Sequence, residues 1–500
     1  MTTDAIPRPA PHRLLLPAVF LSLATVISAV TSLNVALPDL AGDTAASQTQ
    51  VSWVVDSYAL VFAALLLIAG ALGDRYGRRL ALIVGLVLFG GGSLAAMFAT
   101  DIEVLIALRV VLGIGAALVM PATLSTITTV LDAQRRQHAV AIWAGVAGAS
   151  AVLGLLAAGT LLEWFSWESV FGLNVTLALI ASALVLRAVP ESSERPEGRL
   201  DIIGGLLFAI SVGAIVYSII EAPHAGWDSA ETVSVLAAGI ALLAVTIVWE
   251  LRHPNPLLDP RLFGNGRFAA SSLTITMQFL AFFGFMFLLM QYLQFVGDLS
   301  PLLAATSMLP FAVGMMGSSR GSVKIVGHLG RSRTVILGLT VLTGALFALS
   351  RLDADVNYWL LFTALPFLGI GMGLSMTPST SMLTEALPKE QQGVASAVND
   401  LARELGGALG IALLGSILTD TLHDRIGAVG GIGEAADLPA PMLATAMDAF
   451  SDGFSNALFV AAWIIAGTLA LVVALTRGGR RAVDTTSPET TQVANAGEHA

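Results

Sequence analysis

Three charged residues late in the chain share one face of a predicted helix. Asp400, Arg403 and Glu404 stand at positions i, i+3 and i+4 of a long apolar stretch, and this spacing puts their side chains on the same side of a helix. A rise of about 1.5 Å per residue from residue 392 places Glu404 near the midplane of a bilayer and Asp400 nearer one surface. A carboxyl group in a low dielectric holds a proton more readily than in water. The group therefore predicts a proton-binding site in which Arg403 pairs with one acid and leaves the other free to titrate; a static, neutralised triad is the alternative.

Two further charged residues, Asp56 and Arg109, lie in other apolar stretches. A charge inside a membrane span costs at least about 2.5 kcal/mol to insert, so such residues are candidates for function. Asp56 lies one turn into its predicted helix and Arg109 lies at a similar depth, so we predict that the two side chains approach within the distance of a salt bridge. The alternatives are an interfacial carboxylate at Asp56, beside a helix N-terminus, and a purely structural pair.

The segment GDRYGRR lies between the second and third apolar stretches and contains Gly73, Asp74, Arg75, Gly77 and Arg78. Glycine allows a chain to turn in little space. Asp74 and the arginines are able to clamp the ends of neighbouring helices in one state and release them in another, which predicts a gate. Alternatively, the arginines only fix the topology, although topology requires neither Asp74 nor the paired glycines.

Composition indicates the solvent that surrounds these elements. Of the 500 residues, 55% are hydrophobic and only 12% are charged, whereas a soluble domain is about one-quarter charged. A water-soluble fold of this size is therefore excluded. Cysteine is absent, which excludes a disulfide framework, a thiolate metal site and a thiol nucleophile. We expect no metal site.

Fourteen apolar stretches are long enough to cross about 30 Å of hydrocarbon. The predicted spans are residues 14–37, 52–72, 80–99, 103–130, 138–162, 168–188, 201–220, 232–250, 268–292, 301–326, 334–350, 358–382, 392–419 and 452–476. An even number places both termini on one side, and most of the 25 Lys and Arg residues fall on that side. The loops of the other side hold only Arg351 and Arg425. This asymmetry predicts that both termini are cytoplasmic, in the plasma membrane of a bacterial cell.

Two pairs of similar segments indicate an internal repeat. LGIGAALVMPATLSTITTVL begins at Leu112 and LGIGMGLSMTPSTSMLTEAL begins at Leu368; GRRLALIVGL begins at Gly77 and GRSRTVILGL begins at Gly330. The two pairs keep nearly the same offset, which favours duplicated parallel halves over chance similarity between glycine-rich helices. The predicted parts are a cytoplasmic N-terminus (1–13), a six-helix half (14–188), a cytoplasmic linker (189–200), two inserted helices (201–250), a cytoplasmic loop (251–267), a second six-helix half (268–476) and a disordered cytoplasmic tail (477–500).

In several motifs the sequence resembles the major facilitator superfamily, in particular its 14-helix drug:proton antiporters. The motifs are GALGDRYGRR from Gly70, RVVLGIG from Arg109, NVALP from Asn34 and GVASAVNDLARELGG from Gly393. The resemblance covers residues 14–476. It implies an all-α integral membrane protein with the major facilitator fold, of two six-helix halves plus two inserted helices. It also implies that Arg109 handles protons and that Asn34 belongs to the coupling or substrate site.

Two positions depart from the motifs of that subgroup. Ala29 stands where the subgroup usually has an acid, five residues before the Asn of NVALP. In the helix-5 motif, Leu155 replaces the proline that follows Gly154, and Ala158 replaces a glycine before Gly159. Without the proline we expect a straighter helix and a more leaky seam between the halves.

The resemblance implies a secondary transporter that exports hydrophobic or amphipathic compounds, such as drugs, dyes or antibiotics, in exchange for protons. Its partners would be the substrate, protons and the lipid bilayer, with no nucleic acid. No cofactor or nucleotide is expected besides the proton gradient, since the phosphate-loop motif GxxxxGK[ST] is absent. An exporter of lipids or secreted metabolites with the same fold is the first alternative. An intramembrane enzyme is a remote one, because all seven His lie in loops, tails or span ends, and a non-transporting sensor is a third.

Overall fold

The computed structural model describes residues 13–193, 201–387, 392–427 and 438–484, and every regular element within these ranges is a helix. The first half comprises α1 Leu15–Thr44, α2 Gln48–Tyr76, α3 Arg78–Ala96, α4 Ile102–Val130, α5 Ala133–Leu162 and α6 Glu168–Ala188. Two helices follow, α7 Ile202–Ala225 and α8 Ala230–Arg252, then the short 3₁₀ helix η1 Pro260–Gly264. The second half comprises α9 Gly266–Phe295, α10 Pro301–Thr306, α11 Leu309–Leu329, α12 Arg331–Leu349, α13 Tyr358–Glu385, α14 Gln392–Ile426 and α16 Ala440–Asp484.

The described residues contain 14 helices that are long and apolar enough to cross a membrane, which confirms the predicted number. The span predicted at 301–326 is broken into α10 and α11. Pro310 stands in the first turn of α11, and because proline has no N–H it cannot continue the hydrogen bonding of the preceding helix. The last helix, α16, also begins well before the predicted residue 452.

Equivalent glycines show that the two halves are built alike. A methyl group on Gly85 of α3 would lie 2.7 Å from the carbonyl oxygen of Gly115 of α4. A methyl group on Gly338 of α12 would lie 2.8 Å from the carbonyl oxygen of Gly371 of α13. These four glycines occupy matching positions of the two sequence repeats, so the repeat preserves the close packing of small residues that membrane helices use.

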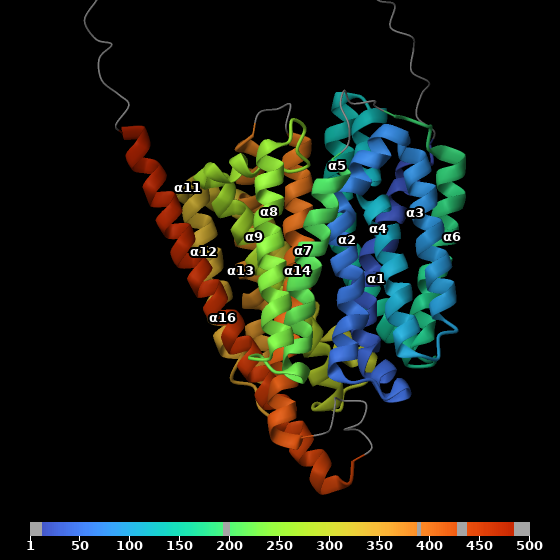
Figure 1. Cartoon of the computed structure of the whole chain (residues 1–500), viewed down its shortest axis with the longest axis vertical. Helices are drawn as coiled ribbons and strands as arrows, with labels where there is room; N and C mark the ends of the chain where they lie inside the picture. Colours follow the sequence, from blue (N-terminus) through green and yellow to red (C-terminus); the bar gives the residue numbers. More distant parts are fainter. Residues whose placement is uncertain (1–12, 194–200, 388–391, 428–437, 485–500) are drawn as a thin grey trace, which may run out of the picture.

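The inserted helices α7 and α8 lie between the two halves (Figure 1). α7 packs against α2 of the first half and α14 of the second, whereas α8 packs mainly against α7. Val212, Val216 and Ile220 of α7 form a small apolar cluster with Ala412 of α14. The insert therefore covers one side of the seam where the halves meet.

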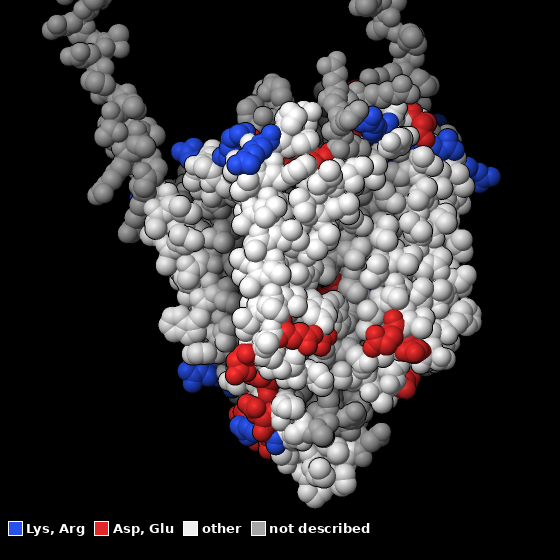
Figure 2. All heavy atoms as spheres, in the orientation of Figure 1, with Lys and Arg blue, Asp and Glu red and all other residues white. Residues whose placement is uncertain are grey.

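The two ends of the bundle differ in charge. In Figure 2, Lys and Arg gather at the upper end of the visible face, and Asp and Glu gather toward the lower end. We call these the basic end, where α2 passes into α3, and the acidic end, where α1 passes into α2. At the acidic end the halves touch: the Gln294 side-chain amide donates to the Val35 carbonyl (3.0 Å), and the Leu302 N–H donates to the Glu163 carboxylate (3.4 Å). These two hydrogen bonds join the halves at the acidic end.

Candidate functional site

The predicted charged group of α14 is present, but among the described residues its arginine forms no close ion pair. Asp400, Arg403 and Glu404 are all half-buried. In the described part of the chain neither acid lies within 4.0 Å of the Arg403 guanidinium. The guanidinium carbon lies 4.8 Å from the centre of the Phe279 ring, a cation–π contact. Arg403 and Asp400 are both within electrostatic range of Glu404, so the group is coupled without being locked into a salt bridge.

Close packing of α14 against α9 sets this arrangement. Added methyl groups on Gly406 and Gly410 would lie 2.3 Å from the Thr276 carbonyl oxygen and 2.1 Å from the Leu280 carbonyl oxygen, so only glycine fits at either position. The contact brings Arg403 over Phe279, one turn from Thr276 on α9.

Asn399 holds Asp400, and sequence reasoning did not select it. Its side-chain nitrogen lies 3.3 Å from an Asp400 carboxylate oxygen, to which it donates, and its oxygen accepts a hydrogen bond from the Thr380 hydroxyl of α13 (3.0 Å). Asn399 directly precedes Asp400 in the motif that begins at Gly393. This position next to the acid was the sequence feature from which its role was predictable. Asn399 therefore links the Asp400 carboxylate to α13.

The predicted ion pair between Asp56 and Arg109 is absent from the described structure. Arg109, only 1% exposed, donates from Nε to the Val54 carbonyl oxygen (2.8 Å), and its guanidinium carbon lies 4.3 Å from the centre of the Tyr58 ring. Asp56 is fully buried, and neither of its carboxylate oxygens has a hydrogen-bond partner among the residues that the structure describes. Residues of a helix are about 100° apart, so Asp56 is turned away from the face of α2 that Val54 and Tyr58 present to α4. Matching depth was therefore insufficient to predict a pair.

Tyr58 lies between Arg109 and the charged group of the other half. Its ring contacts the Arg109 guanidinium, and its buried hydroxyl has no hydrogen-bond partner among the described residues. It is within electrostatic range of both Arg109 and Glu404. Sequence reasoning missed Tyr58, because a tyrosine in an apolar helix is usually a packing residue.

The turn between α2 and α3 ties helices of the first half together. Gly77 has φ +128°, a backbone conformation that favours glycine. Arg78 Nε lies 2.8 Å from the Asp74 carboxylate, and the same guanidinium donates to the Thr129 hydroxyl at the end of α4. Arg79 donates to the Leu186 carbonyl oxygen at the end of α6 (2.8 Å). All of these contacts lie within one half.

Two other predicted residues of this turn lie at the end of α2, and the second half has an equivalent turn. Gly73 is buried in the last turn of α2, where an added methyl would lie 3.3 Å from the Ala81 side chain, and Arg75 lies in the same turn. In the second half, Gly330 also has a positive φ, and Arg331 forms a two-pronged ion pair with Glu385 at the end of α13. In each half, the arginine that follows the positive-φ glycine thus binds the end of the corresponding helix, α4 for Arg78 and α13 for Arg331.

The predicted residues of α1 and α5 are packing positions in this state. The Asn34 side-chain nitrogen donates to the Val30 carbonyl oxygen (2.9 Å), while its buried oxygen has no partner among the described residues. A methyl on Gly154 would lie 2.7 Å from the Ser28 backbone of α1, and one on Gly159 would lie 3.0 Å from the Pro301 carbonyl oxygen of α10. Gly154 therefore permits contact within the first half, and Gly159 permits contact between the halves.

Within the ranges that the structure describes, no group of three or more His, Asp or Glu side chains is arranged to hold a metal ion.

A membrane-embedded bundle of two similar halves, with charged side chains at their junction, has the architecture of a secondary transporter. The family model described as Major Facilitator Superfamily matches residues 19–411. The chain belongs to the Major Facilitator Superfamily.

Several bacterial relatives are similar over most of the chain. The multidrug efflux pump LfrA of Mycolicibacterium smegmatis is 33% identical over 92% of this chain and 96% of its own length. The methyl viologen resistance protein SmvA of Salmonella typhimurium is 35% identical, covering 80% of this chain and 81% of its own. The tetracenomycin C resistance and export protein of Streptomyces glaucescens is 28% identical, covering 89% and 87%.

Solved structures share the fold. A bacterial homologue of the human lysosomal transporter Spinster, in an inward-facing and unoccupied conformation, aligns with a TM-score of 0.66 at 16% identity, covering 93% of this chain and 97% of that one. A D-xylose–proton symporter aligns with a TM-score of 0.60 at 15% identity, covering 90% and 96%. At this identity the similarity concerns the fold alone.

Proposed function

We propose that the protein exports hydrophobic or amphipathic compounds across the plasma membrane of a bacterial cell in exchange for protons. The observation that carries the proposal is the half-buried group of Asp400, Arg403 and Glu404 at the junction of the halves. Within the described ranges no close ion pair neutralises the two acids. The names of the relatives support the substrate class, since they include a multidrug efflux pump and proteins of resistance to methyl viologen and tetracenomycin C. Asn34 and Asp56 are additional candidates for the coupling or substrate site.

The charge difference between the ends supports an orientation. Lys and Arg concentrate at the basic end (Figure 2), and positively charged loops remain in the cytoplasm. The basic end and both termini are then cytoplasmic. Because the halves touch at the acidic end, we assign the structure to a state that receives substrate from the cytoplasm.

Proton exchange then follows from alternating exposure of one acid. Glu404 takes a proton when the acidic end is open to the outside and releases it when the basic end is open to the cytoplasm. Arg403 stabilises the ionised form after release, and Tyr58 with Arg109 supplies a second positive region across the junction. The proton gradient is the energy source, and no cofactor, nucleotide or nucleic acid takes part.

The turn at Gly73, Asp74, Arg75, Gly77 and Arg78 acts as the cytoplasmic gate. Its bonds to α4 and α6 hold the ends of the first half as one rigid unit while the basic end is open.

The proposed parts of the chain are the two halves (14–188 and 268–476), the insert (201–250) and the cytoplasmic segments 1–13, 189–200, 251–267 and 477–500.

Transport into liposomes with an imposed pH gradient tests the function. Purified protein is reconstituted with a panel of aromatic cations, neutral dyes and labelled phospholipid. We expect gradient-driven accumulation of at least one cation or dye, abolished by a protonophore. Movement of the lipid alone would instead support a lipid exporter, the alternative that Ala29 favours because α1 lacks the acid usual in drug exporters. Equal accumulation of the compound with and without the pH gradient would refute proton coupling.

A further inference from the structure

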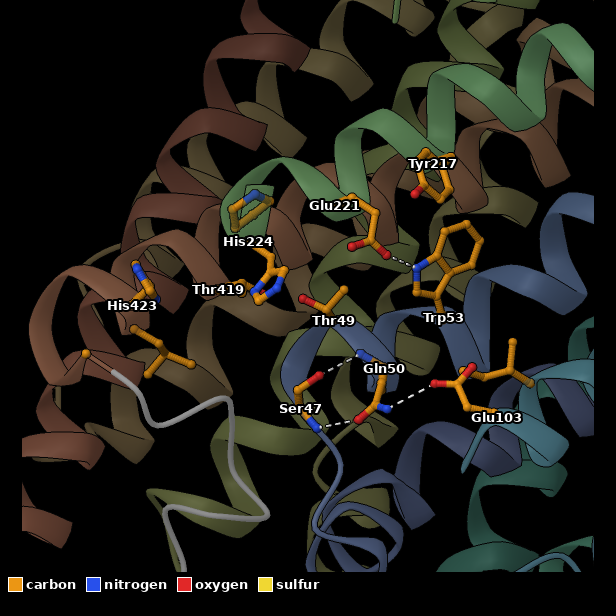
Figure 3. A pocket seen from close by; sticks show the side chains of 14 residues that line it. Ser47, Thr49, Gln50, Trp53, Glu103, Tyr217, Glu221, His224, Thr419 and His423 are labelled. Atoms are coloured by element: carbon orange, nitrogen blue, oxygen red, sulfur yellow. Dashed lines mark hydrogen bonds between the residues drawn. The ribbon is translucent and has the colours of Figure 1, made fainter. Parts of the chain in front are cut away.

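A hollow of about 870 Å³ opens at the acidic end of the molecule (Figure 3). Its walls come from the first turns of α2 and α4, the last turns of α7 and the last turns of α14. Both halves and the insert therefore contribute to it. None of the residues of the α14 charged group lines it, so it is separate from the proposed proton site.

The hollow is negatively charged. Glu221 accepts a hydrogen bond from the Trp53 indole N–H (2.7 Å), and Glu103 accepts one from the Gln50 side-chain amide (3.1 Å). Both donors are neutral, so they orient the carboxylates without cancelling their charge. No Lys or Arg is among the described residues that line the hollow. Two helix N-termini and two helix C-termini surround it, so their dipoles largely offset one another. Two uncompensated carboxylates repel anions and attract cations.

Aromatic faces add a second preference. Trp53 and Tyr217 lie side by side, with ring centres 5.9 Å apart and planes inclined by 46°. In Figure 3 the Glu221 carboxylate lies below Tyr217 and next to Trp53, with one oxygen bound to the indole and the other turned away from it. Tryptophan and tyrosine faces attract cations, and the apolar side chains of Ile106 and Leu422 complete the wall. The volume lies within the range of about 300–1,000 Å³ that suits small-molecule ligands.

We propose that this hollow is a second binding site, which takes a flat organic cation at the acidic end of the transporter. Carboxylates next to ring faces suit a delocalised charge on an aromatic ligand, because the rings stack while the acids supply the opposite charge. Since the walls belong to both halves, an occupant favours the state in which the acidic end is closed. The site therefore goes beyond the proposed proton-coupled export.

Equilibrium dialysis tests the site directly. The protein is held in lipid nanodiscs at pH 8, above the usual titration range of histidine, because His224 and His423 also line the hollow. The probe is radiolabelled methyl viologen, a flat dication that stays out of lipid, and empty nanodiscs give the background. All variants carry Glu404→Gln, so that the central acid does not contribute to binding.

We expect the Glu404→Gln protein to bind the probe and added Glu221→Gln to weaken binding by about tenfold or more. The glutamine oxygen still accepts the Trp53 hydrogen bond, so this change removes charge with little loss of structure. Trp53→Leu should also weaken binding, through the lost ring face. The matched control is Asp228→Asn, which removes the same charge from an exposed position at the same end and should leave binding unchanged. Uncharged bipyridine, the parent of the probe, should not compete.

Two results would overturn the proposal. One is the absence of probe binding in the Glu404→Gln protein, which would place any cation site at the centre. The other is equal affinity of Glu221→Gln and Asp228→Asn, which would reduce the binding to general attraction by the acidic end. Neither outcome depends on transport, so the test is independent of the export activity.

Discussion

Two buried acids of the spans have different surroundings. Asp56 is fully enclosed and has no hydrogen-bond partner among the described residues, whereas Glu404 is half-buried and interacts with Arg403 and Asp400. A coupling acid must reach water from each side in turn, and a partner must stabilise its ionised form. Glu404 meets both requirements better than Asp56 does.

Glu404→Gln should therefore keep substrate binding and counterflow exchange, because the amide resembles the protonated acid. Accumulation driven by a pH gradient should be abolished. Asp400→Asn should have a milder effect, because Asp400 lies nearer the basic end and Asn399 already holds it. Transport in liposomes with and without a gradient measures both variants. Gradient-driven transport that survives in Glu404→Gln would move the coupling site, with Asp56 the next candidate.

Arg109 makes two contacts that lysine cannot make together, the Nε bond to Val54 and the stacking on Tyr58. We predict that Arg109→Lys lowers the stability of the protein by about 1–3 kcal/mol, measured by thermal unfolding in detergent. Arg351→Lys, at an exposed arginine of the acidic end, is the control and should change it by less than about 0.5 kcal/mol. Equal melting temperatures for the two variants would show that the Arg109 contacts contribute little.

The turn between α2 and α3 functions as a unit rather than as single residues. Asp74→Asn removes the charge that Arg78 faces but leaves the bond of Arg78 to Thr129. We expect nearly unchanged expression with slower turnover, because the turn still forms but no longer holds one state. Initial transport rates, normalised to protein in the membrane, measure this. A wild-type rate would remove the gate role from Asp74.

In α5, Leu155 is buried beside Gly154, where α5 touches α1. We predict that Leu155→Pro, which restores the usual residue, bends α5 and tightens the seam between the halves, so that proton leak through protein in liposomes falls. Leu155→Ala, which shortens the side chain without a bend, should not reduce the leak. An unchanged leak in Leu155→Pro would mark the departure as neutral.

For the whole molecule, apolar length and charge asymmetry sufficed to predict the helices, because the bilayer sets a minimum span. Pro310 was a visible signal for the break between α10 and α11, but a proline in a long apolar run also occurs inside helices, as Pro121 does in α4. The pairing of side chains was harder to predict from the sequence. Asp56 and Arg109 have similar depth, but whether Asp56 faces Arg109 depends on which face of α2 meets α4. The close approach of Gly113 to the Tyr58 carbonyl oxygen fixes that face. The hollow at the acidic end was missed because four distant segments build it.

The turns after Gly77 and Gly330 have similar backbone shapes, but their arginines pair with acids at different positions. Arg78 forms an ion pair with Asp74 of α2 and donates to the Thr129 hydroxyl of α4. Arg331, the equivalent arginine of the second half, forms an ion pair with Glu385 of α13. The two halves therefore pair the arginine of the turn with acids from different helices, so a substitution at Asp74 leaves the Arg331–Glu385 ion pair of the other half in place.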